Sequence, residues 1–340
     1  MPSLLTQPER SPSPHRSASG ARRLPELELG LELDRERLRA LFQPCEERRR
    51  LQQLLQLDEE LVLARLADEC EHLDHRWLAH SERTGELHLA YAQPIRWSQE
   101  ALGCSIVQLR HLAGPGLEER TAQLRRLLER VRRRTPGALV TARIPLAEVS
   151  LNQRLSSVGF RWVGAELTGV ISLETAPPLE LPGELRCTLL DTSSLDAVQE
   201  IAAHAHTQNH FFCDPMLPTD FARRIFAAQV RRSLKSSRTR CIGIFEGKQL
   251  LGFIFSNLVQ SFERYGGPRL ANLDFICVDP QVQRRGLGDQ LNRAALSWLY
   301  EQGIRRVSVR TMVNNFRAQA ILRRVGWRPA LSESVFHASL

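Results

Sequence analysis

The segment Val278-Asp-Pro-Gln-Val-Gln283-Arg-Arg-Gly286-Leu-Gly288 decides the fold of this 340-residue chain. Before it, alternating side chains over Leu270–Val278 predict a strand, which Asp279-Pro280 ends. After it, apolar residues at helical spacing predict a helix over Leu287–Trp298, and Gly303 stops that helix. A strand, a glycine-containing loop and a helix start therefore follow one another.

A strand–loop–helix unit of this kind is typical of an anion-binding site. The first N–H groups of a helix lack partners and point outward, and the helix dipole is positive there. Gly286 and Gly288 have no side chains, so a diphosphate can approach the backbone, and the neighbouring arginines can add charge-assisted hydrogen bonds. The expected pyrophosphate ligands are Gln283, Arg284, Arg285, Gly286, Leu287 and Gly288.

Two motifs resemble the GNAT superfamily of acyltransferases. The loop resembles its coenzyme A signature, Q/R-x-x-G-x-G/A after a strand. The stretch Asn315-Phe-Arg-Ala-Gln-Ala-Ile-Leu-Arg-Arg-Val-Gly-Trp327 resembles its N-x-x-A-x-x-L-Y-x-x-x-G-F pattern. Two motifs at this separation are more specific than either alone. The resemblance implies that acetyl-coenzyme A is the co-substrate, that the backbone of Ile276, Cys277 and Val278 pairs with its pantetheine arm, and that Asn315 contacts it.

The chain departs from that pattern at Leu322, where the superfamily has a tyrosine as general acid. Tyr265, or a water molecule held by Asn315, is the candidate source of the proton. Glu263 and Asp274 are candidate general bases. A thiol with a pKa of ~8.5 is already a fair leaving group, so a missing acid slows the transfer rather than forbidding it.

A more diffuse pattern resembles a subgroup that acetylates amino sugars on nucleotide carriers, of the dTDP-fucosamine acetyltransferase type. It comprises His210-Phe-Phe-Cys-Asp214-Pro and Arg224. We expect the acceptor amine to be bound by His210, Asp214, Arg224 and Asp274. A protein N-terminus, a lysine and a small polyamine remain open as alternative acceptors.

An internal echo predicts a tandem arrangement. Leu155-Ser-Ser-Val-Gly-Phe-Arg161 resembles Leu322-Arg-Arg-Val-Gly-Trp-Arg328, which favours two related units in one chain. Residues 86–175 would form a degenerate acyltransferase-like half, because they have no Gln-x-x-Gly-x-Gly. Residues 183–340 would form the catalytic half. The expected fold is a GNAT-type mixed α/β sheet with helices on both faces.

The N-terminal residues differ in composition. Residues 1–25 are rich in Ser, Pro and Arg and are predicted to be a disordered tail without a secretory signal. Residues 26–85 are rich in Leu, Glu, Arg and Gln. They predict a helical extension, which is a candidate homodimer interface.

Composition narrows the classes of partner. Lys and Arg total 46 against 38 Asp and Glu, and this excess would suit an anionic partner or simply reflect an arginine-rich proteome. Only three of 21 aromatic residues are Tyr, which argues against a nucleic-acid stacking platform. Without an apolar run of ~18 residues, no membrane span is expected. Seven cysteines without C-x-x-C spacing predict neither disulfides nor a metal site, and favour the cytoplasm.

These observations predict a cytoplasmic N-acetyltransferase that moves acetyl from acetyl-coenzyme A to a small-molecule amine, and the resemblance favours a nucleotide-linked amino sugar as that amine. Because the tyrosine is missing, the alternative is a non-catalytic acyl-coenzyme A sensor or an interaction module. The sequence does not name the amine or the acyl chain length.

Overall fold

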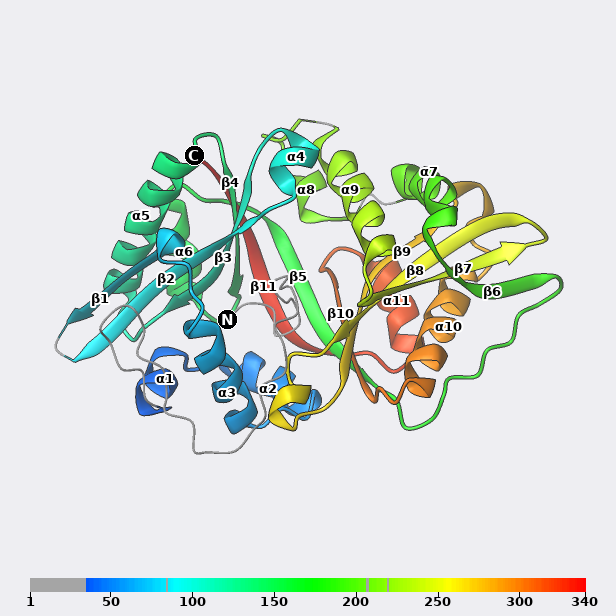
Figure 1. Ribbon diagram of the computed structural model, residues 1–340, viewed down its shortest axis with the longest axis horizontal. Coiled ribbons are helices and arrows are strands. Elements are labelled where there is room, and N and C mark those ends of the chain that lie inside the picture. Colours follow the sequence, from blue (N-terminus) through cyan, green and yellow to red (C-terminus); the bar gives the residue numbers. More distant parts are fainter. Residues whose placement is uncertain (1–34, 84, 206–207, 219) are drawn as a thin grey trace.

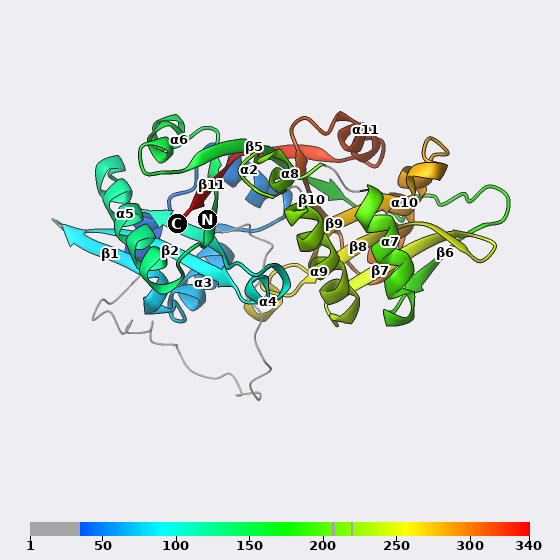
Figure 2. The ribbon, with the colours of Figure 1, turned by 90° about the horizontal axis from the view of Figure 1, so that it is seen from above.

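The computed structural model describes residues 35–83, 85–205, 208–218 and 220–340. The predicted tail over residues 1–25 lies outside them, as does the start of the predicted helical extension. One mixed sheet of eleven strands forms the spine of the molecule (Figure 1), in the order β1-β2-β3-β4-β11-β5-β10-β9-β8-β7-β6. Helices cover both faces (Figure 2), as the sequence predicted. No helix in these ranges is long and apolar enough to cross a bilayer.

The strands are β1 (Leu78–Arg83), β2 (Glu86–Ile95), β3 (Ile106–Ala113), β4 (Leu139–Pro145), β5 (Arg161–Ser172), β6 (Leu185–Leu190), β7 (Thr239–Glu246), β8 (Gln249–Val259), β9 (Leu270–Val278), β10 (Arg306–Met312) and β11 (Arg328–Ser339). The α-helices are α1 (Arg35–Leu41), α2 (Glu46–Leu54), α3 (Glu59–Cys70), α4 (Ser98–Leu102), α5 (Leu117–Arg134), α6 (Val149–Ser156), α7 (Leu195–Ala205), α8 (His210–Cys213), α9 (Phe221–Lys235), α10 (Leu287–Glu301) and α11 (Phe316–Arg324). Short 3₁₀ helices are η1 (His75–Trp77), η2 (Thr192–Ser194), η3 (Glu263–Tyr265) and η4 (Pro280–Val282).

The two halves of the chain exchange their last strands at the centre of the sheet. β5 ends the N-terminal half, yet it pairs antiparallel with β10 as well as with β11. β11 ends the C-terminal half, yet it pairs antiparallel with β4 over Glu333↔Pro145 to Ser339↔Leu139. In Figure 1 the green β5 and the red β11 cross the middle of the molecule side by side. Each half is therefore completed by a strand of the other.

Helices α1–α3 pack against the sheet and not away from it. Their buried residues Leu38, Leu55 and Leu66 share one core cluster with Phe262 and Leu270 of the C-terminal half. The apolar faces of the N-terminal helices are thus covered by the chain itself. A homodimer through these helices stays a prediction.

One local prediction was wrong. Leu78–Arg83, inside the predicted helical extension, is strand β1, which pairs antiparallel with β2. Strand β5 is uninterrupted, although Gly164 and Gly169 lie within it. Gly169 cannot carry a side chain, because a Cβ would lie 2.5 Å from the carbonyl oxygen of Arg328 on the neighbouring strand. These glycines allow close contact between strands, not a turn.

The N-terminal half has an opening between parallel strands that is covered by helices. β3 and β4 pair from Ile106↔Leu139 to Gln108↔Thr141 and then part. The segment that joins α1 to α2 contacts the end of β3. There, Gly114 N donates a hydrogen bond to Leu41 O over 3.2 Å. The Phe42 ring lies edge-on to His111, 5.0 Å between centroids.

Candidate active site

The site begins where β9 and β10 part. They pair in parallel from Leu270↔Arg306 to Leu273↔Val309, and both strands then continue without pairing to each other. On its other edge β9 pairs with β8, and a bulge there skips Asp274, because Phe255 pairs with Phe275 and Ser256 with Leu273. A bulge re-aims side chains and bends its strand. Backbone groups of residues 274–278 are thereby turned toward the opening.

A cavity of about 1170 Å³ occupies this opening. It brings together most of the residues that the motifs singled out, namely Asp274, Ile276, Cys277, Val278, Gln283, Arg284, Gly286, Leu287, Gly288 and Asn315. Arg285 is outside this lining, and pairs on the surface with Glu246 at 2.5 Å.

The loop before α10 has the backbone that an anion site needs. Gly286 has φ 76° and Arg284 has φ 70°, both in the left-handed region. Gly286 is the N-cap of α10 and no side chain caps that helix start, which leaves it to a ligand. A Cβ on Gly288 would lie 3.3 Å from Ile321 Cδ1 of α11, so glycine lets the two helices approach. The loop therefore fits a diphosphate.

Gln283 links the loop to its surroundings. Its Nε2 donates to Val278 O over 3.4 Å, and its Oε1 accepts from Arg317 Nη1 at 2.7 Å. Arg317 lines the cavity and was not predicted. It adds a positive charge beside the loop.

Asn315 both lines the cavity and caps a helix. Its Oδ1 accepts from Ala318 N over 3.2 Å, at the start of α11, so its carbonyl oxygen is engaged with the backbone. Leu322, about two turns after Asn315, lines the same cavity and is 4% exposed. The position of the missing tyrosine is thus an apolar part of the wall.

Tyr265 and Glu263 lie outside the cavity lining. Both belong to η3, which packs against α3. Burial and the nearby Asp68 carboxylate raise the pKa of Tyr265. Glu263 is paired with Arg269 at 3.4 Å. The loop that carries both residues is folded back on the N-terminal helices, which removes the reason for expecting either at the transferred group.

His210 and Asp214 form a buried chain behind the cavity wall. Arg143 Nη2 donates to His210 Nε2 over 3.2 Å, because a guanidinium can only donate. His210 Nδ1 then donates to His337 Nε2 at 2.8 Å, and His337 Nδ1 donates to Asp214 Oδ2 at 2.8 Å. Burial is the main reason why the pKa of both imidazoles is lowered, and this matches two neutral rings.

The structure thus places the predicted acceptor ligands differently. His210 and Asp214 hold Arg143, which does line the cavity, while they themselves are not in its lining. Arg224 donates to Leu102 O at the end of α4 and is also outside the lining. Of the four predicted acceptor residues, Asp274 lines the cavity.

A charged group that the sequence did not single out comes from the exchanged strands. Arg143 Nε donates to Glu166 Oε2 over 2.7 Å, and Arg310 Nε lies 3.3 Å from the same oxygen. Burial opposes ionisation of Glu166, but the two guanidinium groups hold its pKa well below the usual range. β4 and β5 supply Arg143 and Glu166 from the N-terminal half, so only the strand exchange brings them here.

Asp274 has neutral partners. Its Oδ2 accepts from Asn257 Nδ2 at 2.9 Å and from Gln229 Nε2 at 3.2 Å. Amide donors orient a carboxylate without neutralising it. Asp274 is therefore a fixed negative charge at the opening between β9 and β10.

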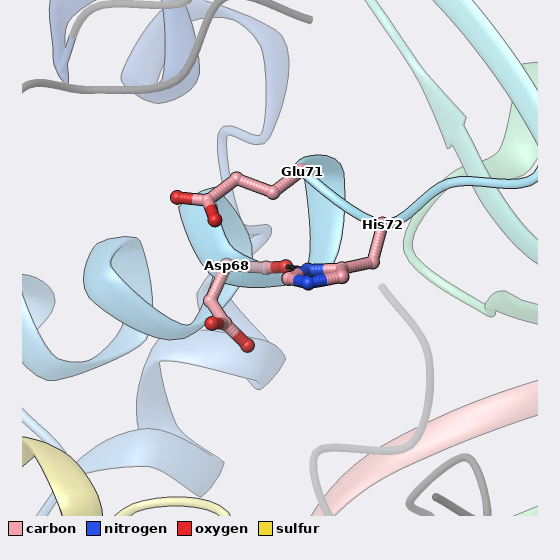
Figure 3. Close-up of side chains that lie close together, drawn as sticks. All are labelled: Asp68, Glu71 and His72. Atoms are coloured by element: carbon pink, nitrogen blue, oxygen red, sulfur yellow. Dashed lines mark hydrogen bonds between the residues drawn. The ribbon is translucent and has the colours of Figure 1, made fainter. Parts of the chain in front are cut away.

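Figure 3 shows the group of potential metal ligands found among the described residues, Asp68, Glu71 and His72 at the end of α3. Their ligand atoms lie within 4.8 Å of one another. The Asp68 carboxylate is already paired with Arg264, and His72 Nδ1 is 2.7 Å from Asp68 O. The group lies away from the cavity lining and is largely exposed, so it takes no part in the site.

The comparisons with known proteins agree with this geometry. Residues 196–327 match the model of the acetyltransferase (GNAT) family. A GCN5-related N-acetyltransferase from Sphaerobacter thermophilus superposes with a TM-score of 0.58 at 14% identity, over 85% of this chain and 89% of that one. The fold is of the GNAT type. No curated protein matches the sequence.

Further solved structures share the GNAT fold over most of both chains. A GCN5-related N-acetyltransferase from Kribbella flavida has a TM-score of 0.52 at 13% identity, over 87% of this chain and 96% of that one. A tandem GNAT protein from the clavulanic acid biosynthesis pathway has a TM-score of 0.52 at 14% identity, over 82% and 87%. At such identities the likeness shows the fold alone, and a tandem GNAT chain is among the structures that share it.

Proposed function

We propose that this protein transfers an acetyl group from acetyl-coenzyme A to a primary amine. The observation that carries the proposal is the opening between β9 and β10. It has the uncapped start of α10 at one end and the Asp274 carboxylate at the other. Such an arrangement lets a thioester and an amine enter one cavity from different sides and meet in it.

The chain's own groups suit each part of the reaction. The helix start, Arg284 and Arg317 would hold the diphosphate. A backbone N–H of the bulged part of β9 would stabilise the oxyanion that develops on the thioester carbonyl. Asp274 would bind the ammonium and accept one proton from it, and the neutral amine would then attack the carbonyl carbon with its freed lone pair. The N–C bond forms, the C–S bond breaks, and the electron pair leaves with sulfur.

Protonation of the leaving thiolate is the step for which the cavity lining offers no evident side chain. Leu322 offers no proton, and Tyr265 lies elsewhere. With a thiol pKa of ~8.5, water suffices to protonate the sulfur at neutral pH. Turnover would consequently be slower than with a general acid, by an amount within the ~10²–10⁴-fold that such a group contributes.

A nucleotide-linked amino sugar is the acceptor that the sequence resemblance favours. The structural support for this acceptor is the basic wall of the cavity, because His210 and Asp214 do not line the cavity themselves. The second candidate function is an acyl-coenzyme A sensor, which is favoured by the apolar Leu322.

The test is thiol release from acetyl-coenzyme A with a panel of amines that includes nucleotide-linked amino sugars. Asp274→Asn should lower kcat/KM by ~10²-fold or more and leave the affinity for acetyl-coenzyme A unchanged. The matched control is Asp196→Asn, on the exposed side of α7, which should behave like the native protein. Tight binding of acetyl-coenzyme A without release for any amine would reject the enzyme and support the sensor.

A further inference from the structure

The acceptor side of the cavity lies on one face of the sheet. Val309 and Leu273, the last paired residues, point into the core that α10 covers. Arg310 follows Val309 and lies opposite Thr168 of β5, with Glu166 two residues along the same strand. Because strand side chains alternate, Arg310 points away from α10. Asp274 contacts Gln229 of α9, so it too lies on the face away from α10.

This face carries two opposite charges, neither of which has an ion-pair partner to itself. Arg143 and Arg310 share the carboxylate of Glu166. The other buried carboxylate near them, Glu333, is paired with Arg48 at 3.6 Å, which leaves one positive charge in excess. Of the carboxylates that line the cavity in the described part of the chain, Glu166 and Asp289 have ion pairs, and Asp274 has none. The excess cation and the lone carboxylate stand on neighbouring strands, on either side of the opening.

Arg310 is the guanidinium with donors to spare. Arg143 is engaged by Glu166 through Nε and by His210 through Nη2. Arg310 meets Glu166 through Nε, and within the described residues its terminal nitrogens make no hydrogen bond. Its side chain is 27% exposed, toward the cavity. Planar paired donors of this kind suit a carboxylate or a phosphate.

We propose that the acceptor is an amine that also carries an anionic group, a carboxylate or a phosphate, close to its nitrogen. The inference rests on the proposed acyl transfer and names the substrate class for it. Asp274 takes the ammonium, and Arg310 takes the anion. The site is then complementary to the whole ligand, because Asp274 and the surplus positive charge of the arginines each meet an opposite charge.

The buried histidines give this arrangement its rigidity. Neutral His210 and His337 tie Arg143 to Asp214, on a loop outside the cavity. With Arg143 fixed, Glu166 is fixed, and Arg310 is held by it. His210 and His337 are therefore positioning residues that act through Arg143.

The experiment compares amines in matched pairs that differ in the anion. The pairs are glycine and glycinamide, phosphoethanolamine and ethanolamine, and glucosamine 6-phosphate and glucosamine. For at least one pair, the anionic member should show a kcat/KM at least tenfold higher in thiol release. Which pair responds distinguishes a carboxylate from a phosphate.

Arg310→Gln should abolish that preference by lowering the ratio of kcat/KM for the anionic member to kcat/KM for the neutral member about tenfold or more, through a higher KM for the anionic member. The control is Arg306→Gln, at the other end of β10, where the arginine pairs with exposed Glu174; it should keep the preference. Acetylation of the neutral members at equal or higher kcat/KM, or a preference that survives Arg310→Gln, would overturn the inference and leave the acyltransferase standing.

A protein that binds acetyl-coenzyme A but acetylates none of these amines would count against the proposed function itself. The inference is then decided by calorimetry on the coenzyme complex. Binding of an anionic member that Arg310→Gln removes would support it, and absence of binding for every anionic member would overturn it.

Discussion

Substitution of Gly286 separates two reasons why the loop needs glycine. Gly286 has φ 76°, and a Cβ there would meet nothing within 4 Å. Any L residue pays for the backbone conformation, roughly 1–2 kcal/mol, but Asn tolerates it best. The affinity of Gly286→Asn for acetyl-coenzyme A therefore measures the effect of the backbone conformation and of the added side-chain volume. Gly286→Asp has nearly the same shape and adds a negative charge.

The charge is expected to weigh more than the shape. A carboxylate about 6 Å from one charge of a diphosphate costs roughly 1.4–2.8 kcal/mol at an effective dielectric constant of 40 to 20. That corresponds to about 10- to 100-fold in Kd. We expect Gly286→Asp to bind acetyl-coenzyme A at least tenfold more weakly than Gly286→Asn, with a difference that shrinks as salt is added.

Isothermal titration calorimetry measures both affinities, and thermal unfolding checks that both variants are folded. If folded Gly286→Asp and Gly286→Asn bind acetyl-coenzyme A equally well at low salt, no diphosphate lies against this loop. The cofactor would then have to be placed elsewhere in the cavity.

Three more outcomes follow from the structure. Tyr265→Phe should leave kcat unchanged, since its ring packs beside α3; a tenfold fall in steady-state thiol release would return it to the site. Leu322→Tyr should give equal or faster release if the ring fits the wall, and Asn315→Ala slower release; the reverse order would exclude a proton donor at position 322. The lowered pKa values of His210 and His337 mean that the unfolded chain binds more protons below pH ~6.5, so the free energy of unfolding should fall as pH drops from there, by about 1.4 kcal/mol per pH unit for each histidine. Urea titrations at several pH values should show this slope, and a smaller one in His337→Gln; a flat profile would mean that the rings are charged in the folded protein.

Most residues that the sequence assigned to coenzyme binding lie together in the structure, because they are close in the sequence. Strand, loop and helix start are contiguous from β9 to α10, Asn315 caps the next helix, and Leu322 lies on it. The cavity lining contains Gly286, Gly288, Asn315 and Leu322, whereas Arg285 lies outside it. Coenzyme binding by these residues stays a prediction.

The residues of the proposed acceptor side could not be predicted from the sequence in the same way. Arg143, Glu166 and Arg310 are distant in sequence and meet through the exchange of β5 and β11. No spacing rule connects them. The sequence singled out His210 and Asp214 as acceptor ligands. It did not show which side chains they contact in the fold. Their link to His337 depends on the last strand.

A seven-residue sequence similarity predicted the tandem fold, but it did not predict the exchange of strands between the halves. Leu155–Arg161 leads into β5 and Leu322–Arg328 leads into β11, and these are the two strands that are exchanged. The echo marks equivalent positions in the two halves. It gives no sign that each strand would be paired inside the other half.

The exchange of strands sets an order of events during biosynthesis. β4 waits for β11 as its neighbour, so about 180 residues separate two adjoining strands. A ribosome that has released the whole N-terminal half has still not supplied its final strand. The exposed edge of β4 must be kept from pairing with other chains until residues 328–339 emerge. Arg143 and Glu166 take their places in the cavity wall at that same moment, so this wall of the cavity is assembled last.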